Sequence, residues 1–312
     1  QLWKQYLKAI RNALRAIKKT TYYIRVHIKA RKGNKRFIFL FIHLVILRAL
    51  RALKFRFNVK DFDNGPVDIV IMTVSKDYAL LEKHLKSLKE NLSQQINKIY
   101  LVSIAHKEIL GFCTSNDITF IDEKQILGYG KESIKYNVNG IDRSGWIFQQ
   151  LLKLSGDKFV EMENYIIVDS DTILINKNSF LEKGKFIFLE NEEWHEPYFR
   201  AFKKMFGYDT KNGLSFTSHM MIFNIKNLKL MKNELENKHG MGWDKVYLSN
   251  IDEKEMSCIS DYDTYANWVL YNFPEKVIAE PLYNTSLNRT KLPHLKELMK
   301  NLKNKYKSIS FH

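Results

Sequence analysis

Two aspartates, Asp169 and Asp171, interrupt an otherwise apolar stretch, residues 165–175 (YIIVDSDTILI). A short apolar, β-branched run is typical of a buried strand, and an unpaired carboxylate inside one is costly. A bound cation offsets that cost, because one or two carboxylates together with substrate phosphates commonly hold Mg²⁺ or Mn²⁺. The alternative is a solvated turn, since Asp-x-Asp triplets arise often by chance. The residue types therefore predict a divalent-metal site if the aspartates end a buried strand.

Apolar runs and helical patterns alternate along the chain around this stretch. Strands connected through helices imply crossover connections, and therefore an α/β fold with a mostly parallel sheet and helices on both faces. Ligands of such folds bind beyond the carboxyl ends of the strands. Because Asp169 and Asp171 follow a predicted strand, we expect them to face the binding crevice. The strands are predicted at residues 67–74, 98–104, 118–121 and 165–168, and the helices at 78–92 and 144–154.

The positive charge of the chain lies in its first 60 residues. The 312 residues include 50 Lys or Arg and 34 Asp or Glu, which gives a net charge of +16. Residues 1–60 hold 17 of the basic residues and no acidic one, so the remainder is close to neutral. Apolar residues at helical spacing in residues 2–19 predict an amphipathic basic helix. The apolar run at 37–47 is too short for a bilayer, which needs roughly 20 residues.

The turn-forming segment 61–66 (DFDNGP) predicts a domain boundary. We expect a basic amphipathic helical segment at 1–60 and a Rossmann-like catalytic domain at 61–312 that ends in a basic helical tail. The basic segment favours an anionic membrane surface over nucleic acid, while packing on the domain or in a homo-oligomer stays open. Two cysteines without a signal peptide favour a cytoplasmic, peripheral location at the inner face of a membrane.

Further polar residues fall at the ends of predicted elements. The turn after the first strand could contact a base, ribose or phosphate, although its serine could equally cap the following helix. A helical face ahead of the aspartates could contact a phosphate or sugar, or could be solvated with its tryptophan in the core. A later arginine could close over phosphates. These candidates for contacts with a base, a phosphate or a sugar are Thr73, Val74 and Ser75 in the turn, Arg143, Trp146, Gln150 and Lys153 on the helical face, and Arg289.

Three further residues are candidates for catalysis. His219 precedes an apolar run at 220–223, where a lone histidine is more often a core residue, and only a family resemblance implies that it binds an acceptor or a metal. Asp261 and Asp263 repeat the two-residue spacing near a predicted helix start. One of them could activate an acceptor as a general base, or both could stabilise the helix N-terminus.

Taken in order, these segments resemble nucleotide-sugar glycosyltransferases of the GT-A fold, in particular a bacterial branch of largely unassigned specificity associated with surface polysaccharides. The resemblance implies that Asp169 and Asp171 hold a Mn²⁺ or Mg²⁺ ion on the donor diphosphate, and that Thr73 and Val74 flank the base. At the positions of Asp261 and Asp263 the family pattern favours glutamates. The likeness covers residues 67–290 and rests on segments 73–74, 145–154, 168–172, 215–224 and 260–265.

The implied reaction is metal-dependent transfer of a sugar from a nucleoside diphosphate donor, UDP-linked in the simplest case, to a cell-surface glycan or lipid-linked acceptor. A membrane-borne acceptor would account for the basic segment at 1–60. A metal-dependent nucleotidyltransferase or phosphohydrolase is the first alternative, because it uses the same residue types. The second is a protein that binds nucleic acid or membrane through residues 1–60.

Overall fold

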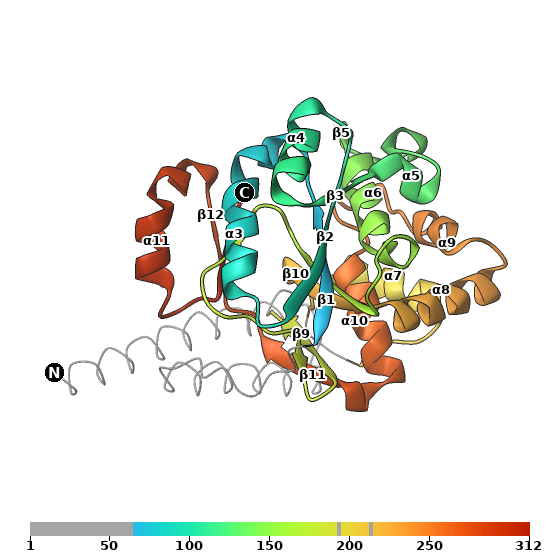
Figure 1. Ribbon diagram of the computed structural model, residues 1–312. Helices are drawn as coiled ribbons and strands as arrows, with labels where there is room; N and C mark the ends of the chain where they lie inside the picture. The colour runs from blue at the N-terminus through green and yellow to red at the C-terminus, as the bar shows by residue number, and fades with distance from the viewer. Residues whose placement is uncertain (1–64, 192–194, 212–214) are drawn as a thin grey trace.

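The computed structural model describes residues 65–191, 195–211 and 215–312. The predictions for residues 1–60, including the amphipathic helix and its membrane contact, lie outside this part of the chain. The described part is an α/β structure in which a twisted sheet separates α3 (Leu81–Asn91) from α6 (Ser144–Lys153) and α10 (Asp261–Asn272) (Figure 1).

A five-stranded sheet forms the centre, in the order β10-β6-β1-β2-β3. The first four strands of the chain in this sheet are parallel, and only β10 runs antiparallel, beside β6. The apolar side chains of these strands are buried because helices cover both faces of the sheet. The predicted mostly parallel α/β fold is therefore confirmed. The strands span Pro66–Met72 (β1), Gln95–Ser103 (β2), Thr119–Asp122 (β3), Asn164–Val168 (β6) and Met220–Asn224 (β10).

The stretch 165–175 does not form one strand. It divides into β6 and β7 (Thr172–Leu174), and β7 belongs to a separate sheet in the order β12-β13-β7. Its neighbour β13 (Ser308–Phe311) lies between β7 and β12 (Asn284–Leu287). The last predicted element, a basic helix at 291–307, is in part a 3₁₀ turn (Arg289–His294) and in part α11 (Leu295–Leu302).

A second, small core joins α11 to this outer sheet. Its side chains come from the outer sheet, from α11 and from the 3₁₀ turn before α3, and the amphipathic α11 turns its apolar face toward the others. The main core surrounds the central sheet instead. The second core therefore fixes the outer sheet beside the end of β6. Its buried members are Leu80, Ile173, Ile175, Leu295, Ile309 and Phe311.

The remaining elements complete the layers. The predicted helix at 78–92 begins as a 3₁₀ turn (Ser75–Leu80) before α3. Other helices are α4 (Lys107–Asn116), α5 (Glu123–Leu127), α7 (Glu196–Phe206), α8 (Ile225–His239) and α9 (Trp243–Ser249). Other strands are β4 (Asn137–Val138), β5 (Ile141–Asp142), β8 (Leu181–Glu182), β9 (Lys185–Glu190) and β11 (Val277–Pro281), and further 3₁₀ turns span Lys131–Ser133, Gly156–Lys158 and Pro274–Lys276.

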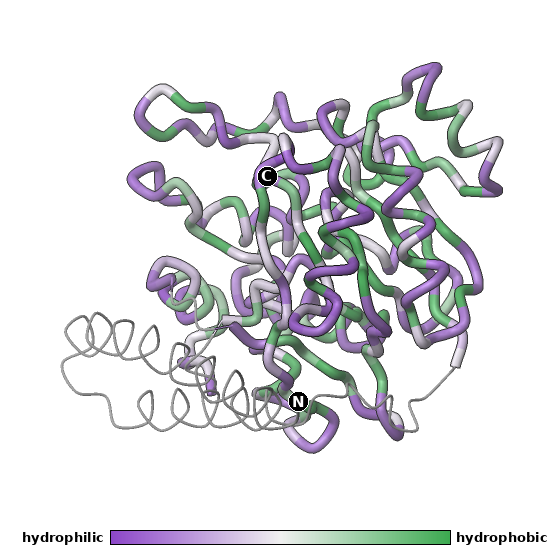
Figure 2. The backbone as a smooth tube through the Cα atoms, turned by 90° about the vertical axis from the view of Figure 1, so that its left-hand side faces the viewer, coloured by the Kyte–Doolittle hydropathy of each residue, from purple (hydrophilic) through white to green (hydrophobic). Residues whose placement is uncertain are grey.

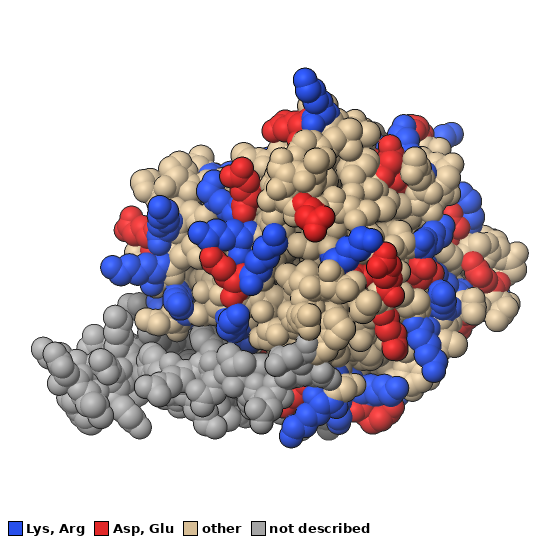
Figure 3. Space-filling view, viewed as in Figure 1, with Lys and Arg blue, Asp and Glu red and all other residues tan. Residues whose placement is uncertain are grey.

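The distribution of polarity matches a folded domain with its core at the central sheet. Apolar residues gather along the inner segments, and hydrophilic residues follow the turns and outer helices (Figure 2). On the face shown in Figure 3, acidic and basic side chains are interspersed. Across residues 65–191, 195–211 and 215–312, no helix is both long enough and apolar enough to traverse a bilayer.

Candidate functional site

The turn between β6 and β7 places Asp169, Ser170 and Asp171 beyond the carboxyl end of β6. Backbone hydrogen bonds hold the turn from two sides. The Asp169 N–H donates to the His219 carbonyl over 2.9 Å, and the Phe311 N–H donates to the Asp171 carbonyl over 2.9 Å. The central sheet therefore fixes the first aspartate, and the outer sheet fixes the second.

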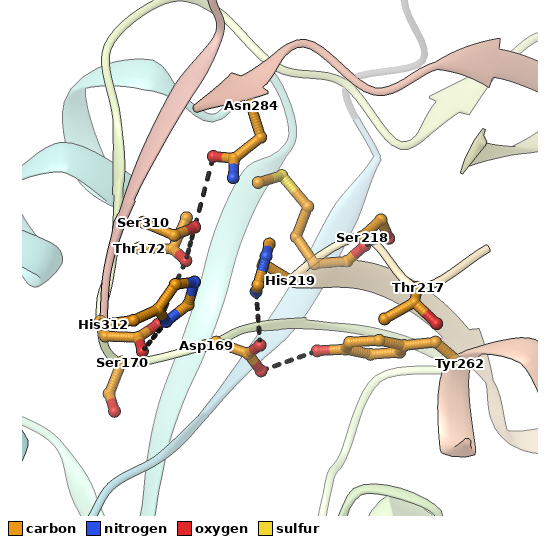
Figure 4. A network of polar contacts seen from close by, with 12 residues as sticks. Asp169, Ser170, Thr172, Thr217, Ser218, His219, Tyr262, Asn284, Ser310 and His312 are labelled. Carbon is orange, nitrogen blue, oxygen red and sulfur yellow. Dashed lines mark hydrogen bonds and ion pairs between the residues drawn. The ribbon is translucent and has the colours of Figure 1, made fainter. Parts of the chain in front are cut away.

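Asp169 lies in a network of charged and polar side chains (Figure 4). Its Oδ1 accepts hydrogen bonds from the Lys153 ammonium over 2.7 Å and from the Tyr262 hydroxyl over 3.0 Å. Its Oδ2 faces Nδ1 of His219 at 3.4 Å. The Lys153 Nζ also lies 3.4 Å from Oδ2 of Asp261 and 4.3 Å from the centroid of the Tyr262 ring. The buried ammonium of Lys153 thus lies next to two carboxylates, those of Asp169 and Asp261.

These contacts set the protonation of the two carboxylates in opposite directions. Burial opposes the ionisation of Asp169, but Lys153 and His219 outweigh it and hold the pKa of Asp169 below its usual range. Burial raises the pKa of Asp261, and Lys153 offsets only part of this rise. Burial also works against the charge of Lys153, yet Asp169 and Asp261 together raise the pKa of this lysine. Lys153 therefore stabilises the ionised form of both carboxylates, and it outweighs burial at Asp169 but not at Asp261.

Asp171 has different neighbours. Its Oδ2 lies 3.3 Å from Nδ1 of His312 and 4.0 Å from Nη2 of Arg289. The same guanidinium pairs with Asp77 and donates to the Lys76 carbonyl over 2.6 Å. The hydrogen bond with Asp171 raises the pKa of His312, although burial opposes this rise. Asp171 is thus held by residues from the last part of the chain.

A polar layer aligns the outer sheet with this turn. The Thr172 and Ser310 hydroxyls share a hydrogen bond of 2.8 Å, and the Ser310 hydroxyl lies 3.3 Å from Oδ1 of Asn284 (Figure 4). These contacts join β7, β13 and β12 through their side chains. His312 follows β13 directly, so the same strand that supports β7 also carries an imidazole to Asp171.

The two carboxylate–imidazole pairs lie side by side, with the ring centroids of His219 and His312 5.2 Å apart. Carboxylate oxygens and imidazole nitrogens are suitable ligands for divalent transition metals, so the donor types fit the predicted ion. The contacts of this conformation are pairwise. Within the described ranges, no three His, Cys, Asp or Glu side chains are grouped as a metal site.

Comparison with known proteins identifies the family. Residues 67–296 match the family described as "Family of unknown function (DUF6492)". The chain belongs to this family. No curated protein matches the chain.

Several solved structures are similar to the chain. Mouse xyloside xylosyltransferase 1, in its apo form, is 13% identical, with coverage of 78% of this chain and 97% of that chain and a TM-score of 0.43. Galactosyltransferase LgtC, in complex with donor and acceptor sugar analogs, is 12% identical, with coverage of 78% and 87% and a TM-score of 0.44. The apo bifunctional glycosyltransferase WbbM is 11% identical, with coverage of 81% and 46% and a TM-score of 0.43.

In this DUF6492 chain the two aspartates at the start of α10 have separate roles. Asp263 is buried and accepts hydrogen bonds from the Ser215 hydroxyl, the Phe216 N–H and the Thr217 hydroxyl over 2.7–2.9 Å. It therefore anchors the segment that leads to His219, and its role as a general base stays a prediction. Within the described residues, Oδ2 of Asp261 is buried with no hydrogen-bond partner and lies 3.4 Å from the Lys153 Nζ, so of the two aspartates Asp261 joins the site.

The structure does not bring the whole predicted helical face to the aspartates. Lys153 ends α6 at the site, whereas Arg143 precedes the helix and lies roughly 15 Å away along its axis. The Arg143 Nε donates to the Met256 carbonyl over 2.8 Å, and its guanidinium covers the Trp146 ring. Gln150 accepts from the Asp261 N–H over 2.8 Å. Arg143 and Trp146 thus contact each other at the end of α6 opposite Lys153, their donor contacts stay a prediction, and Gln150 supports the start of α10.

The turn after β1 holds a buried residue, Thr73, followed by an exposed one, Val74. Thr73 is buried and donates its N–H to the Val102 carbonyl over 3.2 Å, while Val74 is 44% exposed. Ile104, just beyond β2, is 52% exposed. The exposed Ser75 makes no capping hydrogen bond, because Val74 is the residue before the 3₁₀ turn. The carboxyl edge of the sheet therefore carries one exposed apolar side chain after β1 and one after β2.

Sequence reasoning missed Tyr262 and His312. Tyr262 lies between the two predicted aspartates, but a tyrosine near a helix start carries no sign that its hydroxyl reaches Asp169. His312 follows a short alternating segment, Ser308–Phe311, which is compatible with a strand. The sequence offers no signal that this strand pairs with β7, since the two are far apart along the chain.

Proposed function

We propose that the chain is a metal-dependent glycosyltransferase that moves a sugar from a nucleoside diphosphate donor, UDP-linked in the simplest case, to a glycan or lipid-linked acceptor. The observation that carries this proposal is the turn with Asp169 and Asp171 at the carboxyl edge of the sheet. Two imidazoles and two cations, Lys153 and Arg289, lie against it. Ligands of open α/β sheets bind at this edge.

The residues suit a leaving group that gains negative charge. Asp169, Asp171 and His312 would hold a divalent cation, which when bound supplies Lewis-acid stabilisation to the departing diphosphate. Arg289 adds a guanidinium that can contact phosphate oxygens, since its side chain is 26% exposed beside Asp171. Lys153 has a different role, because it is buried below Asp169 and keeps that carboxylate ionised and oriented.

Residues on either side of the aspartates suit two further tasks, which are binding the nucleotide base and accepting a proton from the acceptor. Val74 and Ile104 offer exposed apolar side chains to a nucleotide base at this edge. Asp261 remains the candidate for a proton acceptor, since burial raises its pKa and its Oδ2 is not used in a hydrogen bond. A nucleoside diphosphate sugar would thus extend from the end of β1 to the start of α10.

The test is product identity with a panel of UDP-sugars and Mn²⁺, with and without glycan acceptors. Release of UDP together with acceptor extension supports sugar transfer. Release of pyrophosphate, phosphate or UMP instead supports the nucleotidyltransferase or phosphohydrolase alternative and rejects the proposal. Asp171→Ala should remove turnover, whereas Asp209→Ala should not, because Asp209 is a surface carboxylate that pairs only with Lys203 in the described part of the chain.

We also propose that residues 1–60 bring the enzyme to an anionic membrane surface, where a lipid-linked acceptor would lie. The support is the segregation of 17 basic residues and no acidic one in this segment. The full chain should sediment with vesicles that contain anionic lipid at low salt, and dissociate as salt is raised. Equal binding to purely zwitterionic vesicles would reject an electrostatic attachment.

A further inference from the structure

The two edges of strand β7 are bonded by different kinds of element. On one edge, β13 accepts or donates the backbone hydrogen bonds of Asp171, Ile173 and Ile175. The carbonyls of Thr172 and Leu174 face the other edge, along which no strand pairs with β7 in the described part of the chain. Helix α3 packs against that edge instead. Because unpaired backbone groups are costly when buried, this helix has to supply hydrogen-bond partners.

Three polar side chains of α3 bond this edge of β7. The imidazole of His84 lies 2.7 Å from the Thr172 carbonyl, measured from Nδ1. The Ser87 hydroxyl accepts the Leu174 N–H over 3.1 Å, and the Asn91 amide donates to the Leu174 carbonyl over 3.0 Å. Residues spaced by three and then four positions lie on one face of a helix. This face of α3 therefore takes the place of a neighbouring strand.

Of these three side chains, His84 is the one that contacts the turn with the aspartates. Thr172 is the last residue of that turn, and its N–H donates to the Asp169 carbonyl over 2.9 Å. The Thr172 hydroxyl shares a hydrogen bond of 2.8 Å with Ser310 of β13. With its carbonyl held by His84, each polar group of Thr172 is bonded. The central turn, the outer sheet and α3 thus fix Thr172 from three directions.

The imidazole of His84 is fully buried, and its hydrogen bond determines where its proton lies. A carbonyl oxygen only accepts, so Nδ1 carries the proton. Burial lowers the pKa of His84, although the Thr172 carbonyl and nearby aspartates raise it, so the ring is uncharged near neutral pH. Its Nε2 is buried with no partner among the described residues. An unpaired polar atom lowers stability, so packing alone would favour an apolar side chain here.

We propose that His84 is a positioning residue for the proposed sugar transfer: by holding the Thr172 carbonyl, it fixes the turn of residues 169–172 in the geometry that the donor diphosphate requires. This inference rests on the proposed function and deepens it. His84 is buried, so it acts on the donor only through Thr172. The diphosphate gains negative charge as the sugar leaves, so a misplaced turn should lower kcat more than donor affinity.

Two substitutions of His84 separate its hydrogen bond from its packing. His84→Asn keeps an N–H on an atom bonded to Cγ, as Nδ1 is, but it leaves a cavity. His84→Leu fills the space and has no donor. Packing alone therefore favours the leucine variant, whereas the hydrogen bond favours the asparagine variant. Ser87→Ala is the matched control, because Ser87 is also buried on α3 but its hydroxyl holds Leu174, beyond the turn.

Kinetics and stability are measured on the same four proteins, by UDP release from a UDP-sugar with Mn²⁺ and by urea unfolding. The kcat of His84→Leu should fall by about tenfold or more, with a change in donor KM of less than about twofold. His84→Asn should keep a kcat at least about threefold above that of His84→Leu, although its urea midpoint is no higher. Ser87→Ala should unfold at a lower urea concentration than the wild type and keep its kcat.

Residue-resolved hydrogen exchange tests the turn without any turnover. The Thr172 N–H should exchange at least about tenfold faster in His84→Leu than in the wild type, and His84→Asn should restore most of its protection. In Ser87→Ala the faster exchange should appear at Leu174 instead.

The outcomes that overturn the inference differ from those that reject the proposed function. Equal exchange of Thr172 in His84→Leu and the wild type would show that the imidazole does not fix the turn. A wild-type kcat in His84→Leu, or equal losses of kcat in the leucine and asparagine variants, would show that the hydrogen bond has no part in turnover. In each of these cases the proposed function stands. If the wild type releases no UDP from any UDP-sugar, the proposed function fails, and the positioning role fails with it even where the exchange differences hold.

Discussion

Asp169 and Asp171 are two residues apart, yet they belong to different environments. Asp169 contacts the core of the domain, where Lys153 ends α6, Tyr262 lies in the first turn of α10 and His219 precedes β10. Asp171 contacts Arg289 and His312, which come from the segments before and after α11. The Lys153 side chain is 8% exposed, whereas those of Arg289 and His312 are 26% and 49% exposed.

This difference separates two tasks within one site. The surroundings of Asp169 fix its charge and orientation before any ligand arrives, because two of its three partners, Lys153 and Tyr262, are buried, while the His219 side chain is 26% exposed. Those of Asp171 are more accessible, so its partners can exchange contacts with a phosphate. Changes on the Asp169 side should therefore lower stability and turnover together, and changes on the Asp171 side should lower turnover far more than stability.

Lys153→Met should have the largest effect. The variant leaves Asp169 and Asp261 near each other without their buried cation, which should lower the free energy of unfolding by about 3–5 kcal/mol and abolish donor turnover. Urea unfolding and UDP release measure the two effects.

Lys232→Met is the matched control for this variant. Lys232 is also a buried lysine, paired with Asp157 over 2.5 Å and lying 4.4 Å from the centroid of the Trp243 ring. The Lys232→Met variant should lose a comparable free energy of unfolding and keep normal donor turnover at a temperature where it is folded. If Lys153→Met folds and turns over donor as the wild type does, the buried cation has no part in the site.

Tyr262→Phe should have an intermediate effect. It keeps the ring over which Lys153 lies and removes only the hydroxyl that donates to Oδ1 of Asp169. A hydrogen bond to a charged group contributes about 1.5–3 kcal/mol, so stability should fall by that amount and cation affinity should fall with it. Unfolding midpoints and calorimetric titration with Mn²⁺ check both. A variant with wild-type cation affinity would show that Lys153 and His219 orient Asp169 without the hydroxyl.

Much of this architecture could be predicted from the sequence, because its signals are local. The apolar runs of β1, β2 and β6 identify buried parallel strands, and the carboxyl-edge rule then places Asp169 and Asp171 at a binding edge. The spacing of α6 likewise brings Lys153 to the aspartates. These inferences need only the side chains within one element and its neighbours.

The rest could not be predicted, because it depends on contacts between distant segments. His312 reaches Asp171 only because β13 pairs with β7, more than 130 residues earlier in the chain. Asp263 has the same residue type and spacing as Asp261, and only the fold brings the donors of residues 215–217 to its oxygens. Arg143 had the right charge and helical face, but it lies at the far end of α6 from Lys153.

Arg289→Met should affect turnover much more than stability. The guanidinium is partly exposed, so its pairs with Asp77 and Asp171 should contribute only about 1 kcal/mol or less to unfolding. If Arg289 contacts the donor diphosphate, the variant should raise the KM for a UDP-sugar with little change in the urea midpoint. Initial rates across donor concentrations test this. A large loss of stability with an unchanged KM would make Arg289 a structural clamp of the outer sheet.

The pH dependence of stability should have opposite signs on the two sides. The pKa of Asp169 is lowered in the folded state, so its stabilising contribution is present above the ordinary value of 3.8 and is lost as the pH falls through the folded pKa. The pKa of His312 is raised, so its contribution is present below the ordinary value of 6.5 and is lost as the pH rises through the folded pKa. The two residues thus act at opposite ends of the pH range.

His312→Gln should isolate the smaller of these contributions. Because this imidazole is half exposed, wild-type stability should decline only slightly as the pH rises above 6.5, and the variant should lack that decline. Urea unfolding at a series of pH values above and below 6.5 measures the difference. An unchanged decline in the variant would mean that His312 and Asp171 do not interact in solution. The pH dependence of stability would then no longer distinguish the Asp171 side from the Asp169 side, and the two sides would differ only in how deeply their residues are buried.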